Sequence, residues 1–155
     1  MAGMIVRNKY VVIKHHIDEA PRKSDFAISE QLISLNSTNS SKSKVVVKNL
    51  YVSIDPYLIN CMKTQSNTQI LNVQGVDYIL PGQEIRGSGV GEVVYSKEAD
   101  FGRGDLVLGL LSWGEYTLVE DGRKLLKLDN AMGFPLSYYA GGVLGMCSCF
   151  SAYTN

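Results

Sequence analysis

Tyr57 occupies a position in the sequence that suits contact with a ligand. It follows Asp55-Pro56 at the end of a long apolar run, Lys44–Tyr57. Proline cannot donate a hydrogen bond to a strand ladder and favours an extended conformation in the residue before it, so the run ends here. A side chain just beyond such an end lies at the rim of a sheet, where ligands usually bind. Taken by itself, a core strand followed by a turn is the simpler interpretation of the run.

Three closely spaced glycines resemble a phosphate-binding loop at first sight. They are Gly87, Gly89 and Gly91. The dinucleotide-binding pattern needs a further glycine where this chain has Glu92, and a helix where Val93–Tyr95 continues a strand. We therefore reject nucleotide binding by these residues. Glycines in a strand let the backbone approach another backbone or a ligand closely at a sharp bend.

The cysteines and histidines are poorly spaced for a metal site. Cys147 and Cys149 are two residues apart rather than three, and the adjacent His15 and His16 would point to opposite faces of a strand. Structural or surface roles fit these residues better. With Cys61 the cysteines are odd in number, which argues against a disulfide framework and predicts a reducing compartment.

The elements that would position these residues are short strands. In Lys44–Tyr57 the alternate positions from Val46 to Ile54 are almost wholly aliphatic, so this face is expected to pack in the core. Tyr51 on the opposite, polar face is expected to be structural. The other expected strands are Ile5–Lys14, Phe26–Leu35, Ile85–Tyr95, Leu106–Leu111, Gly114–Val119 and Leu125–Leu128.

Polar segments join these strands. Asp18–Asp25 is typical of a turn, and Asn36–Ser43, rich in Ser and Asn, is typical of a solvated hairpin connection. Asn60–Pro81 is a long polar loop, and loops of more than about a dozen residues are often functional lids or insertions. Many short strands, turns rich in Gly and Pro, and no convincing helix predict an all-β barrel or sandwich. Trp113 and Tyr116 are expected to pack within it.

Composition excludes several classes of partner. The chain has 155 residues, enough for one ordinary domain with a real core. Its 15 basic and 15 acidic residues cancel, so nothing favours binding to nucleic acid or to an anionic membrane. No signal sequence is recognisable, and no apolar run approaches the roughly 20 residues that cross a bilayer. We expect a soluble, cytoplasmic protein.

The character of the sequence changes after Ala131. Phe134–Tyr153 is almost uncharged and rich in small and aromatic residues, and Pro135 suits the first turn of a helix. A segment this apolar is expected to pack against another surface, such as another domain or the second chain of a homodimer. The sequence stops soon afterwards without a polar tail, which we interpret as an interrupted chain.

Four segments, in this order, carry a resemblance to a known family. The chain is similar to the N-terminal, GroES-like domain of the medium-chain dehydrogenase/reductase superfamily. More narrowly, it resembles the plant NADPH-dependent 2-alkenal (double-bond) reductases of the leukotriene B4 dehydrogenase/prostaglandin reductase group. The four segments are VVVKNLYVSIDPY (Val45–Tyr57), PGQEIRGSGVGEVV (Pro81–Val94), FGRGDLVLGLLSWGEY (Phe101–Tyr116) and PLSYYAGGVLGM (Pro135–Met146).

The resemblance implies a fold and an activity. Residues 1–130 would form a mainly β, GroES-like, partly open barrel that binds the substrate. Residues 131–155 would be a short, helical, apolar lead-in to a Rossmann domain that is missing from this sequence. The family transfers hydride from NADPH to the β-carbon of an α,β-unsaturated aldehyde or ketone and protonates the α-carbon. Such a protein must orient the nicotinamide and stabilise the developing enolate oxygen.

The resemblance also assigns site residues. Tyr57 and Ser88 would bind the substrate, and Pro56, Tyr57 and Met146 would border the cofactor. Tyr153 is a further position near the nicotinamide in the family. No catalytic residue is expected in this chain, because the family's tyrosine near the substrate carbonyl lies on the Rossmann domain. Zinc-using relatives have a Gly-His-Glu segment where this chain has Gly87-Ser88-Gly89, so no metal is expected.

Three departures from the family pattern affect the expected site. Ser88 stands where the plant reductases usually have a tyrosine that reaches into the substrate pocket. Leu58-Ile59 replaces an arginine that usually follows Tyr57. The segment before Tyr153 is one residue longer than usual, and one extra residue turns a helix by about 100°. Substrate preference and docking of a nucleotide domain therefore stay open.

Three hypotheses follow. The first is a fragment of an NADP-dependent 2-alkenal reductase, which by itself would be catalytically incomplete. The second is a truncated, non-catalytic GroES-like module that contacts a partner protein through Phe134–Tyr153. The third and weakest is an unrelated all-β binding domain. A Rossmann domain encoded after Asn155 would favour the first hypothesis, and an in-frame stop would favour the second.

Overall fold

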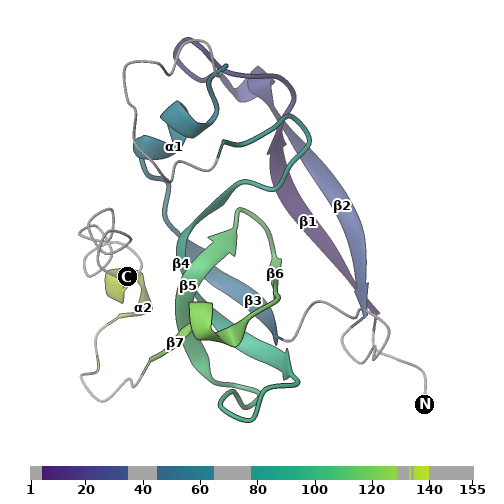
Figure 1. The fold of residues 1–155 in the computed structure, drawn as a ribbon, viewed down its shortest axis with the longest axis vertical. Helices are drawn as coiled ribbons and strands as arrows, with labels where there is room; N and C mark the ends of the chain where they lie inside the picture. Colours follow the sequence, from purple (N-terminus) through teal and green to yellow (C-terminus); the bar gives the residue numbers. More distant parts are fainter. Residues whose placement is uncertain (1–4, 35–44, 65–77, 129–132, 134, 140–155) are drawn as a thin grey trace.

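The computed structural model describes residues 5–34, 45–64, 78–128, 133 and 135–139. In chain order these residues form β1 (Ile5–Ile13), β2 (Phe26–Ser34), β3 (Val45–Val52), α1 (Tyr57–Cys61), β4 (Arg86–Ser96), β5 (Leu106–Ser112), β6 (Tyr116–Val119), β7 (Leu126–Lys127) and α2 (Leu136–Tyr138). Short 3-10 turns at Lys23–Asp25 and Gly122–Lys124 precede β2 and β7. The fold is therefore mainly β, as the sequence predicts (Figure 1).

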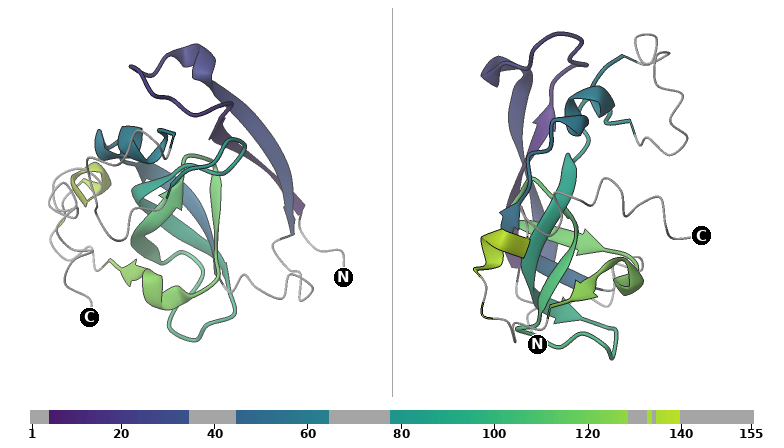
Figure 2. Two further views of the ribbon diagram at one scale, coloured as in Figure 1. Left: turned by 45° about the horizontal axis from the view of Figure 1, so that its top comes forward. Right: turned by 90° about the vertical axis from the view of Figure 1, so that its left-hand side faces the viewer.

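The strands form two antiparallel sheets. β1 and β2 pair in an unbroken register over their whole length, and the larger sheet has the order β6-β3-β4-β5-β7. Isolated bridges from Tyr10 to Gly114 and from Val12 to Glu84 connect β1 to chain segments next to the larger sheet. Figures 1 and 2 show the β1–β2 hairpin standing beside this sheet without closing onto it. This is the partly open arrangement that the family resemblance implies.

Two clusters of buried side chains make up most of the core. The first lies between the end of β1, helix α1 and the segment before β4, and consists of Ile13, Ile17, Leu58, Cys61, Met62, Ile79 and Ile85. The second fills the inner side of the larger sheet and consists of Val45, Val47, Val93, Val107, Leu111, Val119 and Leu125. As predicted, Trp113 packs, against the first cluster, and Tyr116 packs against a smaller one.

The core face of β3 is not the face that the sequence predicts. Val47 is fully buried, whereas Leu50 is 37% exposed and Ile54, just past the strand, is 77% exposed. The register between β3 and β4 also shifts just after Asn49. From the sequence, the side of β3 with more aliphatic residues was expected to be buried. Up to the register shift the inner face instead holds Val45, Val47 and the hydrogen-bonded Asn49, so the predicted face is wrong there. Beyond the shift Val52, on the predicted face, packs against the second cluster.

A short helix follows β3 where the sequence predicts only a turn. β3 ends at Val52, and Tyr57 is the first residue of α1. Pro56 caps the helix with φ −55° and ψ −28°, which suits proline at the start of a helix. A helix of five residues has too few apolar positions to show a 3.6-residue period, so the absence of helix was predicted wrongly. The other strands lie where they were predicted, with small differences at their ends.

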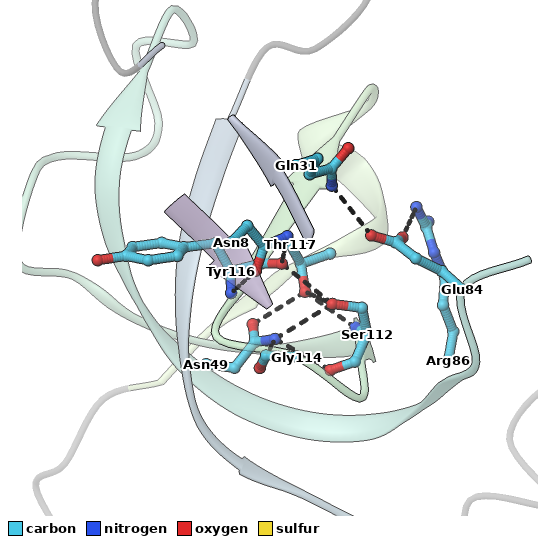
Figure 3. Close-up of polar contacts among 9 residues, drawn as sticks. All are labelled: Asn8, Gln31, Asn49, Glu84, Arg86, Ser112, Gly114, Tyr116 and Thr117. Atoms are coloured by element: carbon cyan, nitrogen blue, oxygen red, sulfur yellow. Dashed lines mark hydrogen bonds and ion pairs between the residues drawn. The ribbon is translucent and has the colours of Figure 1, made fainter. Parts of the chain in front are cut away.

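Buried polar side chains join the two sheets (Figure 3). The Asn8 side chain on β1 donates to the Tyr116 carbonyl at 3.1 Å, and its oxygen accepts from the Tyr116 N–H at 2.9 Å. On β3, Asn49 Nδ2 donates to the Ser112 and Gly114 carbonyls at 3.0 and 2.8 Å. Its Oδ1 accepts from Thr117 Oγ1 at 2.9 Å. The chain between β5 and β6 is thus held by both sheets.

Helix α2 packs on the outer face of the larger sheet. Leu136 and Tyr139 contact Val90 on β4 and Leu108 on β5, and Leu128 joins them. Figure 2 shows α2 against these strands. The helix begins just after Pro135, as the sequence predicts. None of the helices in the described ranges is both long enough and apolar enough to cross a bilayer.

β2 is the outer strand of its hairpin. Ile28 and Leu32 are 71% and 73% exposed on it. Between them, Glu30 lies 3.6 Å from Arg7 and 3.7 Å from Lys9 of β1. Within the described part of the chain, β1 is the strand that pairs with β2, so the other edge of β2 remains open.

Several predictions concern residues outside the described ranges. These are the loop Asn36–Ser43, most of Asn60–Pro81, and nearly all of Phe134–Tyr153, together with the proposed division between residues 1–130 and 131–155.

Candidate functional site

Tyr57 lies at the rim of the larger sheet, on a connection that is bonded to strand β4. The Ser53 N–H donates to the Ser88 carbonyl at 2.7 Å. Within the connection, Ser53 Oγ donates to Asp55 Oδ1 at 2.7 Å, and the Leu58 N–H donates to the Asp55 carbonyl at 3.0 Å. Tyr57 itself is 46% exposed. The prediction that Tyr57 lies just past the end of the strand therefore agrees with the structure.

Helix α1, which begins at Tyr57, is packed into the core. Leu58, Cys61 and Met62 are buried in the first core cluster. The Cys61 carbonyl accepts from the Ile79 N–H at 2.8 Å, and the Met62 carbonyl accepts from the Ile17 N–H at 2.9 Å. A side chain on a well-packed element keeps its position better than one on a free loop.

Ser88 lies on the outer face of β4. It pairs with Leu110 on β5, which is 55% exposed. Paired residues of antiparallel strands share a face, so Ser88 and Leu110 point to the same side of the sheet. The next pair on the same face, Val90 on β4 and Leu108 on β5, contacts helix α2. Among the described residues, Ser88 and Leu110 therefore lie at the end of this face that α2 leaves uncovered.

The glycines beside Ser88 allow close packing on the inner side. A Cβ atom built on Gly89 would lie 2.7 Å from the Tyr51 carbonyl oxygen, and one on Gly91 would lie 2.7 Å from the Lys48 oxygen. Both residues belong to the continuous strand β4. The predicted bent strand with close backbone approach is confirmed, and the rejected phosphate loop is not present at these residues.

An exposed, largely apolar surface surrounds Ser88. Tyr51 pairs with Val90, so it shares the outer face with Ser88 and Leu110. Tyr51 is 47% exposed, which agrees with its predicted place on the polar side of the strand. We call the following set the rim surface: Tyr51, Ile54, Tyr57, Ser88 and Leu110. Tyr51 and Leu110 were not recognised from the sequence as neighbours of Ser88, because only the strand register places them on its face. Ile54 follows β3 in the connection to Tyr57.

Of the other two predicted cofactor contacts, one lies within the described residues and one does not. Pro56 is exposed directly beside Tyr57. Met146 lies outside the described residues, as do Cys147, Cys149 and Tyr153. Together, Tyr57, Pro56 and Ser88 form one region of the molecule, through the bond between Ser53 and Ser88.

The two histidines contact different partners. They follow the end of β1 rather than lying within it. His15 Nε2 is 3.5 Å from Asp25 Oδ1, and His16 Nδ1 is 3.3 Å from the Met62 carbonyl oxygen. Cys61 is buried with its thiol toward the Tyr57 carbonyl. No three His, Cys, Asp or Glu side chains among the described residues gather as metal ligands would.

The shifted ionisable groups lie in turns. A hydrogen bond from the Arg22 backbone lowers the pKa of Asp25, with further help from Ser24 and His15. A hydrogen bond from Lys127 lowers the pKa of Asp105. Neither turn contains a residue of the rim surface. The rim surface can therefore offer hydroxyl groups and apolar contact, and these residues provide no fixed charge.

Comparison with known sequences identifies relatives over nearly the whole chain. A family described as the N-terminal domain of oxidoreductase matches residues 9–128. The NADP(+)-dependent 2-alkenal reductase of Nicotiana tabacum is 38% identical over 141 residues, which cover 91% of this chain and 38% of that protein. The (+)-pulegone reductase of Mentha piperita is 35% identical over 143 residues, 92% of this chain and 40% of that protein.

Solved structures show the same fold. CurA from Vibrio vulnificus superposes with a TM-score of 0.66 at 26% identity, over 94% of this chain and 39% of that one. A complex of Etr1p with NADP and crotonyl-CoA gives a TM-score of 0.60 at 18% identity, over 97% of this chain and 44% of that one. The chain thus spans about two fifths of the length of the curated relatives it matches.

Proposed function

Because this chain belongs to the family of N-terminal oxidoreductase domains of the medium-chain dehydrogenase/reductase type, we propose that it is the substrate domain of an NADPH-dependent double-bond reductase. The substrate is an α,β-unsaturated aldehyde or ketone. The names of the two plant relatives support this reaction, since one is a 2-alkenal reductase and the other a pulegone reductase.

The observation that carries the proposal is the rim surface itself. Tyr57 is held on a packed helix and still exposes 46% of its surface. Leu110 on β5 is 55% exposed, and Ile54, in the connection before Tyr57, is 77% exposed. Large apolar side chains gathered and exposed in one region mark a surface that another molecule covers. Here the covering molecules would be the substrate and the cofactor-binding part of the enzyme.

The surface suits an uncharged substrate. Lys63 is the only basic residue in the sequence between Lys48 and Arg86, the stretch that supplies Tyr51, Ile54 and Tyr57. A phosphate-bearing substrate such as a coenzyme A thioester would need cationic side chains to bind it. A small enal or enone needs only apolar contact and a hydrogen-bond donor for its carbonyl oxygen.

The same charge pattern limits how much of NADPH this domain could hold. The exposed Pro56–Tyr57 pair offers a flat apolar contact that fits a nicotinamide ring, with Met146 as a further neighbour. The phosphates would have to bind to other parts of the protein, because the connection before Tyr57 has no basic residue and Arg86, two residues before Ser88, is already paired with Glu84. When bound, NADPH supplies the hydride, and the role of this domain is to orient the enone beside it.

Tyr57 and Ser88 have different roles in this proposal. The Tyr57 hydroxyl would donate to the substrate oxygen, on which negative charge develops as hydride reaches the β-carbon. Ser88 leaves room for a larger substrate beside Leu110, because its side chain is small. Neither residue is asked to transfer the proton to the α-carbon.

Further features of the proposal follow from the family. We propose a zinc-independent enzyme, since Gly87-Ser88-Gly89 contains no zinc ligand type. We also propose a cytoplasmic protein without nucleic-acid or membrane partners, and a homodimer as its assembled state. The alternative is a non-catalytic module that binds a partner protein through its apolar C-terminal segment.

Oxidation of NADPH with a small enal, such as 2-hexenal, tests the proposal. The 155-residue chain alone should give no turnover, because the hydride donor lacks its phosphate site. The same chain followed by its nucleotide-binding domain should turn over, and Tyr57→Phe should lower kcat/KM about tenfold through the lost donor. Thr64→Ala serves as the control, since Thr64 contacts Asp18 away from the rim surface. Turnover by the isolated chain, or none by the extended protein, would contradict the proposal.

A further inference from the structure

Gly87 is the point where the connection carrying Tyr57 comes closest to strand β4. A Cβ atom built on Gly87 would lie 2.8 Å from the Ser53 carbonyl oxygen and 3.2 Å from Trp113 Nε1. It would lie 3.6 Å from Leu58 Cδ1, which is ordinary contact. Real Cβ atoms almost never approach a backbone oxygen within 3.0 Å, so any side chain at this position would displace a neighbour.

The two crowded neighbours differ in how firmly they are held. Trp113 is bonded on both sides, because its N–H donates to the Ile85 carbonyl at 2.8 Å and its carbonyl accepts from the Val11 N–H at 2.8 Å. Its ring packs on the first core cluster. Ser53 belongs to the irregular connection between β3 and α1, which is tied to β4 through the bond from Ser53 to Ser88. The connection is therefore the part that would move.

Movement there would reach both predicted substrate contacts. Ser53 and Leu58 enclose the short segment that contains Tyr57, and Ser88 directly follows Gly87. We propose that Gly87 is a positioning residue, which by lacking a side chain sets the separation between Tyr57 on α1 and Ser88 on β4. This inference rests on the proposed function, since the separation matters only if substrate lies between the two residues.

Trp113 adds an independent sign that this contact is set by close packing. Its indole N–H is buried and has no hydrogen-bond partner among the described residues. A buried donor without a partner costs free energy. The indole nitrogen lies beside the space that a side chain on Gly87 would take. A side chain there would therefore meet a group that already lacks a hydrogen-bond partner among the described residues.

The chain contains two matched controls for an alanine substitution at Gly87. Gly91 lies on the same strand and is at least as crowded, by Val47 Cγ1 and the Lys48 oxygen, yet its neighbours belong to β3 and not to the connection. Gly102 lies in a turn, where the nearest atom to a new Cβ is Asp105 Oδ2 at 3.6 Å. Gly91→Ala therefore measures the effect of crowding within the sheet without moving the connection. Gly102→Ala measures the effect of replacing a glycine where there is no crowding.

Amide hydrogen exchange and tyrosine resonances measured by NMR on the 155-residue chain test the positioning directly. In Gly87→Ala, exchange of the Ser53 N–H should be about tenfold faster and the Tyr57 ring resonances should shift. The Asn49 N–H, bonded to the Glu115 carbonyl at 2.8 Å, should exchange as in the parent chain. Gly91→Ala should lower the melting temperature without a selective change at Ser53, and Gly102→Ala should change neither.

Kinetics of the protein with its nucleotide-binding domain separate positioning from damage to the fold. Gly87→Ala should raise KM for an enone and also lower kcat, with a combined loss of about tenfold in kcat/KM, because a displaced Tyr57 no longer donates well to the developing negative charge. Gly91→Ala and Gly102→Ala should leave both constants unchanged below their melting temperatures. If Gly87→Ala does not fold, Ser53→Pro removes the N–H that bonds Ser88 while leaving Gly87 in place, and it should cause the same changes.

The outcomes distinguish the two proposals. Unchanged Ser53 exchange and Tyr57 resonances in a folded Gly87→Ala chain would overturn the positioning role. Unchanged Tyr57 resonances in a folded Ser53→Pro chain would overturn it as well. So would equal effects of Gly87→Ala and Gly91→Ala on KM. If the resonances shift as expected but the parent protein reduces no enone, the positioning role stands and the proposed function fails.

Discussion

At the scale of single residues, Asn49 contributes more to the fold than its polar side chain suggests. It lies on the inner side of β3 next to fully buried Val47. Its amide group uses both donors on the carbonyls of Ser112 and Gly114, and its oxygen accepts from Thr117. A buried amide with each of its partners in place is stabilising, and losing the donors would leave carbonyl groups unpaired.

Asn49→Asp is expected to destabilise the chain by about 2–3 kcal/mol, because a carboxylate would face two carbonyl oxygens that it cannot bond. Chemical unfolding at neutral pH measures the change. Asn60→Asp, the same substitution at a partly exposed residue of α1, should cost less than about 0.5 kcal/mol. Equal stability of the two variants would show that the hydrogen bonds of Asn49 contribute little.

At the scale of elements, β7 is a two-residue strand held mainly by its neighbours. Lys127 Nζ lies 2.7 Å from Asp105 Oδ2, and this oxygen also accepts from the Gly102 N–H at 2.7 Å. The Lys127 hydrogen bond is the larger cause that lowers the pKa of Asp105 below 3.8. Asp105 therefore joins the turn before β5 to the strand that pairs with β5.

Because the pKa of Asp105 is lowered in the folded chain, the free energy of unfolding should fall as the pH falls. The ionised carboxylate stabilises the folded chain above the unfolded pKa near 3.8, and this contribution is lost as pH falls through the lower folded pKa. We expect the urea midpoint to fall between pH 5 and pH 2, and to fall less in Asp105→Asn. Asp100→Asn, at an exposed residue nearby, should keep the parent's pH dependence. An unchanged slope in Asp105→Asn would contradict this role.

Elements also show where prediction from sequence succeeds. The strands with clear alternation or β-branched runs, such as Ile5–Ile13 and Leu106–Ser112, were placed to within a residue or two. Helix α1 was missed because its five residues are too short for a helical period. The inner face of β3 was misassigned because curvature and pairing with β4, and not aliphatic content, decide which side is buried.

At the scale of the whole molecule, the order of four motifs predicted the family and the mainly β fold. It also predicted the location of Tyr57 at the rim. Apart from Ser88, which the family resemblance assigned, the remaining members of the rim surface could not be predicted from sequence. Leu110 and Tyr51 lie beside Ser88 only through strand pairing across about 20 to 40 residues of sequence, which no local pattern encodes.

The open edge of β2 leads to a prediction for the assembled state. Glu30→Val would replace the charge between exposed Ile28 and Leu32 with a β-branched apolar residue, and would remove the partner of Arg7 and Lys9. We expect concentration-dependent association, measured by light scattering and by thioflavin T fluorescence. Glu19→Val, at an exposed position of the polar turn after β1, should leave the chain as dispersed as the parent. Dispersed Glu30→Val at high concentration would contradict this.

The exposed edge of the β1–β2 hairpin affects the chain during synthesis and folding, before any substrate binds. A strand with a free edge and two apolar side chains can recruit an identical strand from another newly made copy, so Glu30 acts as a gatekeeper during synthesis and folding. One carboxylate between two cations is enough to make strand addition costly, since a second copy would bring a like charge to the same place. The colloidal behaviour of this domain in a crowded cell therefore depends on a residue far from its chemistry.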